Sequence, residues 1–259
     1  MTQLSTPECC TVPAVESKYT PKGIVQELNG KTCYIVGDRT ATKAIVAIYD
    51  IFGFHSSSQQ GADILAALTG CRVYLPDLFD GNPLPLDTIP ADTQEKQTRM
   101  SSCKTRATDQ VFTGLGNPIR YSEQLTSLGN YLKSQGYKSV GLYGLCWGSK
   151  PAAIVSSQDT PYSALVLIHA SLLEPDDAKK ITIPTANFTS SHEDNDVIRA
   201  FNAEAKANPS IGSTFVTHHY PDAHHGFAGA RADLEDNSLR ASFQDVYQRT
   251  ANFFLQHLA

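Results

Sequence analysis

The pentapeptide Gly144-Leu-Cys-Trp-Gly148 places a cysteine midway between two glycines. This is the spacing of a nucleophile elbow, in which a strand turns sharply into a helix and presents a nucleophile at the turn. Glycine is needed on both sides because larger side chains would clash with the neighbouring backbone. The thiol then lies at a helix N-terminus, where the dipole and free N–H groups favour a thiolate and a developing oxyanion. The pattern therefore predicts that Cys146 is a nucleophile.

A thiol nucleophile needs a base, and the base needs an acid to orient it. Behind such an elbow these groups follow in the order nucleophile, acid, base, each on a loop after a strand. His225 lies in Pro-Asp-Ala-His-His-Gly-Phe227, after an expected strand, and is the predicted base. Asp194 follows an earlier expected strand and is the predicted acid, with Asp196 as its competitor. The remaining histidines near these loops are expected to be bystanders: His192, His218, His219 and His224.

Short β-rich runs alternate with longer helical stretches along the chain, which predicts an α/β fold with a mostly parallel sheet and helices on both faces. The stretch 79–90 carries a glycine and three prolines and is expected to be a loop. The strands are expected at 31–36, 43–49, 72–75, 139–143, 162–169, 185–189 and 214–220. The helices are expected at 58–68, 119–133, 146–156, 196–207 and 239–258.

Length and composition restrict the classes of function. The 259 residues suit one domain, 1–259, with 1–20 as an N-terminal lead-in. The net charge is −5 and no basic block is visible, which argues against binding to nucleic acid or to a membrane surface. No apolar run approaches the roughly 20 residues of a membrane-spanning helix. The N-terminus has no signal-peptide pattern, so a cytoplasmic location is expected.

The six cysteines are expected to be thiols rather than a disulfide framework, because nothing indicates secretion. Their spacing is not that of a metal site, so neither a metal nor another cofactor is expected. The adjacent Cys9 and Cys10, or Cys146 itself, leave a redox-active thiol protein as one alternative function.

Four separated motifs together give a specific resemblance: Tyr49-Asp-Ile-Phe-Gly53, Pro76-Asp-Leu-Phe79, the elbow and His225-Gly-Phe227. Over nearly the whole chain, the sequence resembles the fungal branch of the dienelactone hydrolase family. The resemblance implies a single-domain α/β-hydrolase fold. It also implies a Cys-Asp-His triad of Cys146, Asp194 and His225, with an oxyanion hole formed by the backbone N–H groups of Ile51 and Trp147.

Two positions depart from the bacterial members of that family. Asp50 stands where they carry a glutamate that helps to deprotonate the cysteine, so it is either an accessory acid or a structural carboxylate. Phe79 stands where one of two substrate-binding arginines would lie. Arg231 is a candidate for the other, the alternative being a solvated surface residue. The missing arginine predicts a preference for neutral or apolar substrates.

The expected function is therefore hydrolysis of a small ester, lactone or enol lactone through an acyl-cysteine intermediate, as in carboxymethylenebutenolidase-type enzymes. The alternatives on the same fold are a lactone isomerase or acyl transferase of a biosynthetic pathway, and a non-catalytic ligand-binding or regulatory protein. The expected partner is a small-molecule substrate, and the chain is expected to be a monomer or a homodimer.

Overall fold

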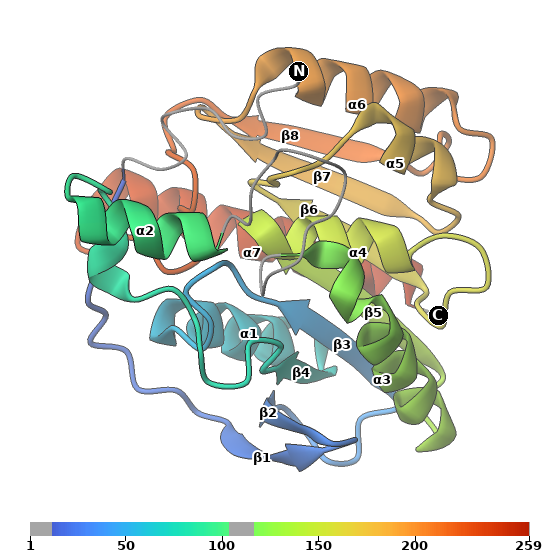
Figure 1. Cartoon of the computed structure of the whole chain (residues 1–259). Coiled ribbons are helices and arrows are strands. Elements are labelled where there is room, and N and C mark those ends of the chain that lie inside the picture. Colours follow the sequence, from blue (N-terminus) through green and yellow to red (C-terminus); the bar gives the residue numbers. More distant parts are fainter. Residues whose placement is uncertain (1–11, 104–116, 259) are drawn as a thin grey trace.

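A computed structural model describes residues 12–103 and 117–258, with side chains except at 100–103. Eight strands form one sheet in the order β1-β2-β4-β3-β5-β6-β7-β8 (Figure 1). The β1–β2 and β2–β4 pairs are antiparallel, and all the other pairs are parallel. The strands are β1 (Ile24–Leu28), β2 (Lys31–Val36), β3 (Lys43–Ile48), β4 (Arg72–Pro76), β5 (Ser139–Leu145), β6 (Ala164–Ile168), β7 (Thr185–Ser190) and β8 (Val216–Tyr220).

Helices cover both faces of this sheet, as Figure 1 shows. Helices α1 and α7 contact each other on one face, and α3 to α6 make consecutive contacts on the other. The helices are α1 (Ser56–Thr69), α2 (Gln94–Cys103), α3 (Ser122–Ser134), α4 (Ser149–Val155), α5 (Pro175–Lys180), α6 (Asn195–Ala207) and α7 (Asn237–His257). The predicted α/β class with a mostly parallel sheet is confirmed.

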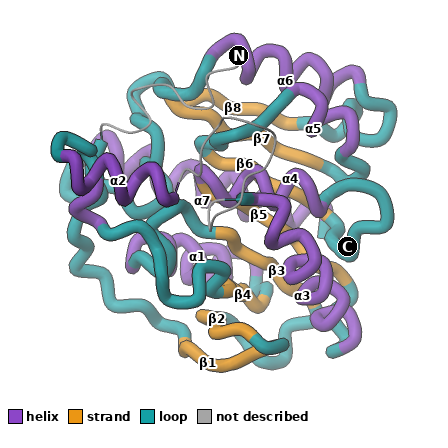
Figure 2. The backbone as a smooth tube through the Cα atoms, viewed as in Figure 1, coloured by secondary structure: helices purple, strands orange, loops and turns teal. Residues whose placement is uncertain are grey.

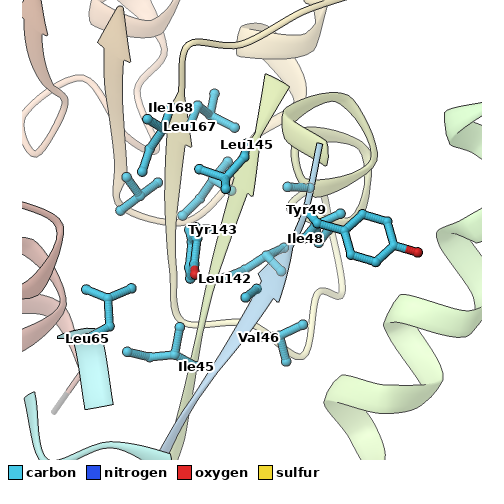
Figure 3. Close-up of a cluster of buried hydrophobic side chains, with 14 of the residues drawn as sticks. Ile45, Val46, Ile48, Tyr49, Leu65, Leu142, Tyr143, Leu145, Leu167 and Ile168 are labelled. Carbon is cyan, nitrogen blue, oxygen red and sulfur yellow. The ribbon is translucent and has the colours of Figure 1, made fainter. Parts of the chain in front are cut away.

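The central strands hold the core because they are covered on both faces. Every residue of β5 and β6 is buried, as a parallel strand between two helical layers requires. Figure 3 shows part of this core, in which Ile45 and Ile48 of β3, Leu142 and Leu145 of β5, and Leu167 of β6 lie together. This packing fixes the ends of the three strands that carry the candidate site.

Strand β1 and helix α5 are among the elements that were not expected from the sequence. Strand β1 is mostly exposed and pairs antiparallel with β2 at the edge of the sheet. Helix α5 is only six residues long and polar. Neither segment has the periodic apolar pattern on which a sequence-based prediction depends. The predicted loop at 79–90 contains only a short 3₁₀ turn, Leu86–Thr88.

The segment before β1 is hydrogen-bonded to the loops that follow β3 and β8. The Val15 N–H donates to the Ala230 carbonyl at 3.0 Å, and the His55 ring contacts the Val15 carbonyl at 2.9 Å. His55 also caps α1 by accepting the Ser57 N–H at 3.2 Å. Burial lowers the pKa of His55, which favours the neutral ring that can donate at one nitrogen and accept at the other. Cys9 and Cys10 lie outside the described residues.

Candidate active site

The predicted nucleophile elbow is present between β5 and α4. Cys146 has a φ of 52° and begins a short 3₁₀ turn, Cys146–Gly148, that leads directly into the helix. A Cβ at Gly144 would lie 2.3 Å from the Gly148 carbonyl oxygen. A Cβ at Gly148 would lie 2.6 Å from the carbonyl oxygens of Ile48, the last residue of β3, and Tyr49, which follows it. Both glycines are therefore required by close backbone approach, which explains the G-x-C-x-G spacing.

Three side chains form a continuous hydrogen-bonded chain at the carboxyl ends of β5, β7 and β8, whose loops gather at this edge of the sheet (Figure 2). The Cys146 Sγ lies 3.0 Å from Nε2 of His225, and Nδ1 of His225 lies 2.8 Å from Oε1 of Glu193. The exposed fractions are 4% for Cys146, 1% for His225 and 8% for Glu193. A thiol, an imidazole and a carboxylate are therefore aligned in a site that excludes most water, where electrostatic interactions are strong.

Glu193 is itself held in place by the loop that carries it. Its Oε1 accepts the Ser190 hydroxyl at 2.6 Å, and its Oε2 accepts the Ser190 backbone N–H. Three donors, counting His225, therefore meet one buried carboxylate. These contacts fix the orientation of the carboxylate, so that Oε1 faces Nδ1 of the imidazole.

The choice of Asp194 as the acid facing His225 is corrected by this geometry. Asp194 is the N-cap of α6, and its Oδ1 accepts the backbone N–H groups of Asp196 and Val197 at 2.9 and 3.2 Å. Asp196 is exposed and forms an ion pair with Arg199. The turn after β7 points Glu193 inward and its two acidic neighbours outward. The sequence alone did not identify Glu193.

Sequence reasoning also missed two residues on the loop after β6. The Ser171 Oγ lies 3.4 Å from the Cys146 Sγ and 3.4 Å from Nε2 of His225. The His169 ring, fully buried, lies 5.1 Å from the His225 ring and 5.6 Å from that of Phe227. A sequence signal for these two residues was available, because they lie at or just after the end of the predicted strand 162–169. Because β6 pairs with β5, its carboxyl end must lie beside the nucleophile.

The two backbone groups predicted for an oxyanion hole follow β3 and β5. The Trp147 N–H belongs to the residue after the nucleophile, at the start of the turn into α4. Among the described residues, no group accepts a hydrogen bond from the Ile51 N–H. The next two N–H groups, of Phe52 and Gly53, both donate to Asp50.

The Asp50 carboxylate is buried and accepts hydrogen bonds from the backbone of two loops. It is 2% exposed, and its Oδ1 accepts the Phe52 N–H while its Oδ2 accepts the Ala230 N–H, each at 2.9 Å. It therefore joins the loop after β3 to the loop that follows His225. None of its hydrogen bonds within the described chain reaches the Cys146 sulfur.

Aromatic side chains pack beside the nucleophile where an arginine was absent from the sequence. The Phe79 ring lies 4.7 Å from Trp147 and 5.1 Å from Tyr49, and the Tyr121 ring lies 5.3 Å from Trp147. Asp80, the next residue, points away and forms an ion pair with Lys31. The side chains packed around Trp147 here are consequently aromatic rather than cationic.

Arg231 is buried, so the alternative that it is a solvated surface residue was wrong. It is 2% exposed, and its guanidinium carbon lies 5.4 Å from the centre of the Phe52 ring. A Cβ at Gly226 would lie 2.8 Å from the Arg231 Cδ, so the side chain packs against the loop of His225. Its Nε has no hydrogen-bond partner, and none of the acidic side chains in the described chain forms an ion pair with it.

Two of the expected bystander histidines lie next to His225, whereas His218 and His219 lie on the edge strand β8. The His192 and His224 rings stack with centres 6.4 Å apart, and Nδ1 of His192 lies 3.5 Å from the His225 N–H. Burial lowers the pKa of His224, so this neighbour of the base favours its neutral form.

Neither a metal cluster nor a membrane-spanning helix is found in 12–103 and 117–258. No group of three or more histidine, cysteine or acidic side chains in these ranges is arranged to hold a metal ion. None of the helices there combines the length and the apolar character needed to cross a bilayer.

Known proteins similar to this chain point to one family. Residues 32–258 match the model of the dienelactone hydrolase family. An uncharacterized AIM2 family protein of Schizosaccharomyces pombe is 30% identical over 95% of this chain and 97% of its own length. The hydrolase pyvD of Aspergillus violaceofuscus is 25% identical over 100% of this chain and 99% of its own.

Solved structures show the same fold at lower identity. A putative dienelactone hydrolase from Klebsiella pneumoniae superposes with a TM-score of 0.65 at 17% identity, over 88% of this chain and 93% of that one. A dienelactone hydrolase from Anabaena variabilis gives a TM-score of 0.57 at 16% identity, over 93% and 99%. The family model spans most of the chain and the elbow stands at its expected place in the sheet. The chain therefore belongs to the dienelactone hydrolase family of α/β-hydrolases.

Proposed function

We propose that the protein hydrolyses small ester, lactone or enol-lactone substrates through a Cys146–His225–Glu193 triad and an acyl-cysteine intermediate. The observation that carries this proposal is the unbroken chain of contacts from the Cys146 Sγ to Nε2 of His225 and from Nδ1 of His225 to Glu193. A nucleophile within reach of a base, which is itself oriented by a buried carboxylate, is the arrangement that covalent acyl transfer requires.

The first half of the reaction forms the acyl-enzyme. Nε2 of His225 takes the thiol proton, and the thiolate attacks the substrate carbonyl carbon. The carbonyl oxygen becomes an oxyanion that accepts the N–H groups of Ile51 and Trp147. The tetrahedral intermediate collapses when the bond to the leaving oxygen breaks and Nε2–H of His225 protonates that oxygen. Glu193 stabilises the imidazolium that exists between these two proton transfers.

The second half returns the free enzyme. Neutral His225 takes a proton from water, and the resulting hydroxide attacks the thioester carbonyl carbon. The same two N–H groups hold the second oxyanion. The bond between carbon and sulfur breaks, the carboxylic acid leaves, and the Cys146 sulfur recovers its proton from His225. No metal or organic cofactor takes part in either half.

The experiment is a screen of p-nitrophenyl acetate, lactones, enol esters and thioesters against the wild type and Cys146→Ala. We expect turnover to fall by about 10⁴-fold or more in the variant, because triad residues act as a unit. Cys71→Ala is the matched control, since Cys71 is a second buried free thiol outside the site. Wild-type turnover in Cys146→Ala would contradict the mechanism.

Labelled water separates the alternative reactions of the same residues. Hydrolysis in H₂¹⁸O places one ¹⁸O atom in the acid product, whereas lactone isomerisation places none. Acyl transfer to an added alcohol gives a new ester instead of the acid. A chain that binds these compounds but turns over none of them would favour the ligand-binding alternative. Loss of free thiol under mild peroxide without any turnover would favour the redox alternative.

Buried Arg231 favours a second candidate substrate class, in which the acyl compound carries a carboxylate. Burying a charge is costly unless a partner compensates it, and within the described chain Arg231 has no carboxylate partner. The aromatic rings of Tyr49 and Trp147, which pack around Phe79, favour neutral substrates instead. Comparing kcat/KM for a carboxylated dienelactone and its neutral ester, in wild type and Arg231→Ala, decides between them. A preference for the acid that is lost in the variant would assign Arg231 to the substrate.

A further inference from the structure

The hydroxyl of Ser171 is a third polar group at the reacting pair. Its Oγ lies 3.4 Å from the Cys146 Sγ and 3.4 Å from Nε2 of His225. Sulfur is larger than oxygen, so 3.4 Å is a normal hydrogen-bond separation from Sγ but a long one from a nitrogen. The hydroxyl can donate only one hydrogen at a time. Of these two contacts, the one with the sulfur therefore has the better hydrogen-bond geometry.

The loop after β6 is built so that this hydroxyl stays in place. The Ser171 backbone N–H donates to the Cys146 carbonyl at 3.0 Å, which joins the loop to the elbow. His169 and Leu172, on either side of Ser171, have φ values of 38° and 64°. Non-glycine residues adopt this left-handed region at an energetic cost, and such residues concentrate at functional sites. The loop is thus held in a particular shape by the surrounding structure.

We propose that Ser171 is a further catalytic residue, which donates its hydroxyl hydrogen to the Cys146 thiolate and so stabilises the reactive thiolate–imidazolium pair. The proposal rests on the cysteine mechanism proposed above. When the thiol proton moves from Sγ to Nε2 of His225, the sulfur becomes an anion to which both Nε2–H and the Ser171 Oγ–H can donate. No other bond forms or breaks in this step. Hydrogen bonds to a charged group are stronger than those between neutral groups, so the hydroxyl favours the ionised pair.

This role is distinct from a structural one. The bond that anchors the loop to the elbow uses the backbone N–H of Ser171 and remains in any variant of its side chain except proline. Ser171 is half-buried, whereas the Cys146 and His225 side chains are nearly inaccessible. Removing the hydroxyl deletes one oxygen from a half-buried side chain, so we expect the packing around it to change little.

The experiment measures the rate of Cys146 alkylation by iodoacetamide as a function of pH, with peptide mapping to separate Cys146 from the other cysteines. Burial raises the pKa of Cys33 to about 12 and also raises that of Cys71, so both stay protonated and unreactive below pH 9. In Ser171→Ala we expect the midpoint of the profile to rise by about one pH unit, which slows alkylation below the midpoint about tenfold. Ser171→Thr keeps the hydroxyl and should keep the wild-type midpoint.

Ser191→Ala is the matched control. Its hydroxyl donates to the Ala223 carbonyl at 2.9 Å on a neighbouring loop and touches neither Cys146 nor His225. An unchanged midpoint in Ser171→Ala, or an equal shift in Ser171→Thr, would overturn the role of the hydroxyl. A wild-type midpoint near 8.5, the value of a free cysteine, that is also unmoved in His225→Ala would instead overturn the activated cysteine itself. The two failures are therefore distinguishable.

Discussion

Two buried carboxylates lie in the loops that follow β3 and β7, on opposite sides of β5, and they accept hydrogen bonds from different donors. Glu193 follows β7 and accepts from the His225 imidazole and from Ser190. Asp50 follows β3, on the other side of β5, and within the described part of the chain its carboxylate accepts two backbone N–H groups, those of Phe52 and Ala230. Both are less than a tenth exposed. The burial of the two groups is similar, and their partners differ.

The partners decide what each carboxylate can do. A carboxylate bonded to an imidazole can orient a base and stabilise its charged form during a reaction. A carboxylate whose two oxygens each accept a fixed amide joins two loops, and its contribution is to the shape of the site. We therefore expect a change at Glu193 to affect the chemical step and a change at Asp50 to affect mainly stability.

Among these variants, Glu193→Gln should lower kcat/KM the most. The amide is neutral and cannot stabilise the imidazolium, so we expect kcat/KM to fall by about 10²–10⁴-fold. Glutamine has nearly the same shape, but its NH₂ group must face one of the donors that the two Glu193 oxygens accept, so we also expect a loss of stability of about 1–3 kcal/mol, with the fold retained. Steady-state kinetics on the best substrate of the screen, together with a circular dichroism spectrum, measures this. A loss of less than about threefold would remove Glu193 from the mechanism.

Asp50→Asn should lower stability more than chemistry. Asparagine keeps one acceptor oxygen, but its amide group turns donors toward a backbone N–H that needs an acceptor. We expect the free energy of unfolding to fall by about 1–3 kcal/mol. Below the lowered Tm, kcat/KM and the pH profile of Cys146 alkylation should stay close to those of the wild type.

The control for Asp50 is Asp63→Asn. Asp63 is also buried, and it accepts from Tyr19, from the Lys22 N–H and from Tyr34, away from the nucleophile. Asp63→Asn should lower the free energy of unfolding in the same way, without any effect on the pH profile of Cys146 alkylation. If Asp50→Asn alone raised the midpoint of the alkylation profile, Asp50 would be an accessory acid for the thiol after all.

The smallest effect is expected at Asp194, next to Glu193. Asp194→Ala removes the N-cap of α6 and should cost about 1 kcal/mol, or about 2–4 °C in Tm. Asp194→Asn keeps the cap and should leave both Tm and kcat/KM nearly unchanged. Thermal denaturation and kinetics of the pair measure this. A hundredfold loss of activity in Asp194→Asn would return the acid role to Asp194.

The sequence by itself predicted the fold class, the tight turn at Cys146 and the place of His225 beside that cysteine. The apolar runs of β3, β5 and β6 required strands covered on both faces, and the glycines around Cys146 required a tight turn between a strand and a helix. These features are local, since they depend on the spacing of residues within one segment. His225 was identified because a histidine at the end of the last strand has a defined place once the strand order is known.

Only the tertiary structure decided which of the neighbouring polar side chains face the sulfur. Glu193 and Asp194 are adjacent in the sequence and chemically similar, but successive residues of a turn point in different directions, and the start of α6 uses the second as a cap. Ser171 lies 25 residues from Cys146 and reaches it only because β6 pairs with β5. The burial of Asp50 and Arg231 likewise depends on loops from distant strands that close over them, which no local pattern records.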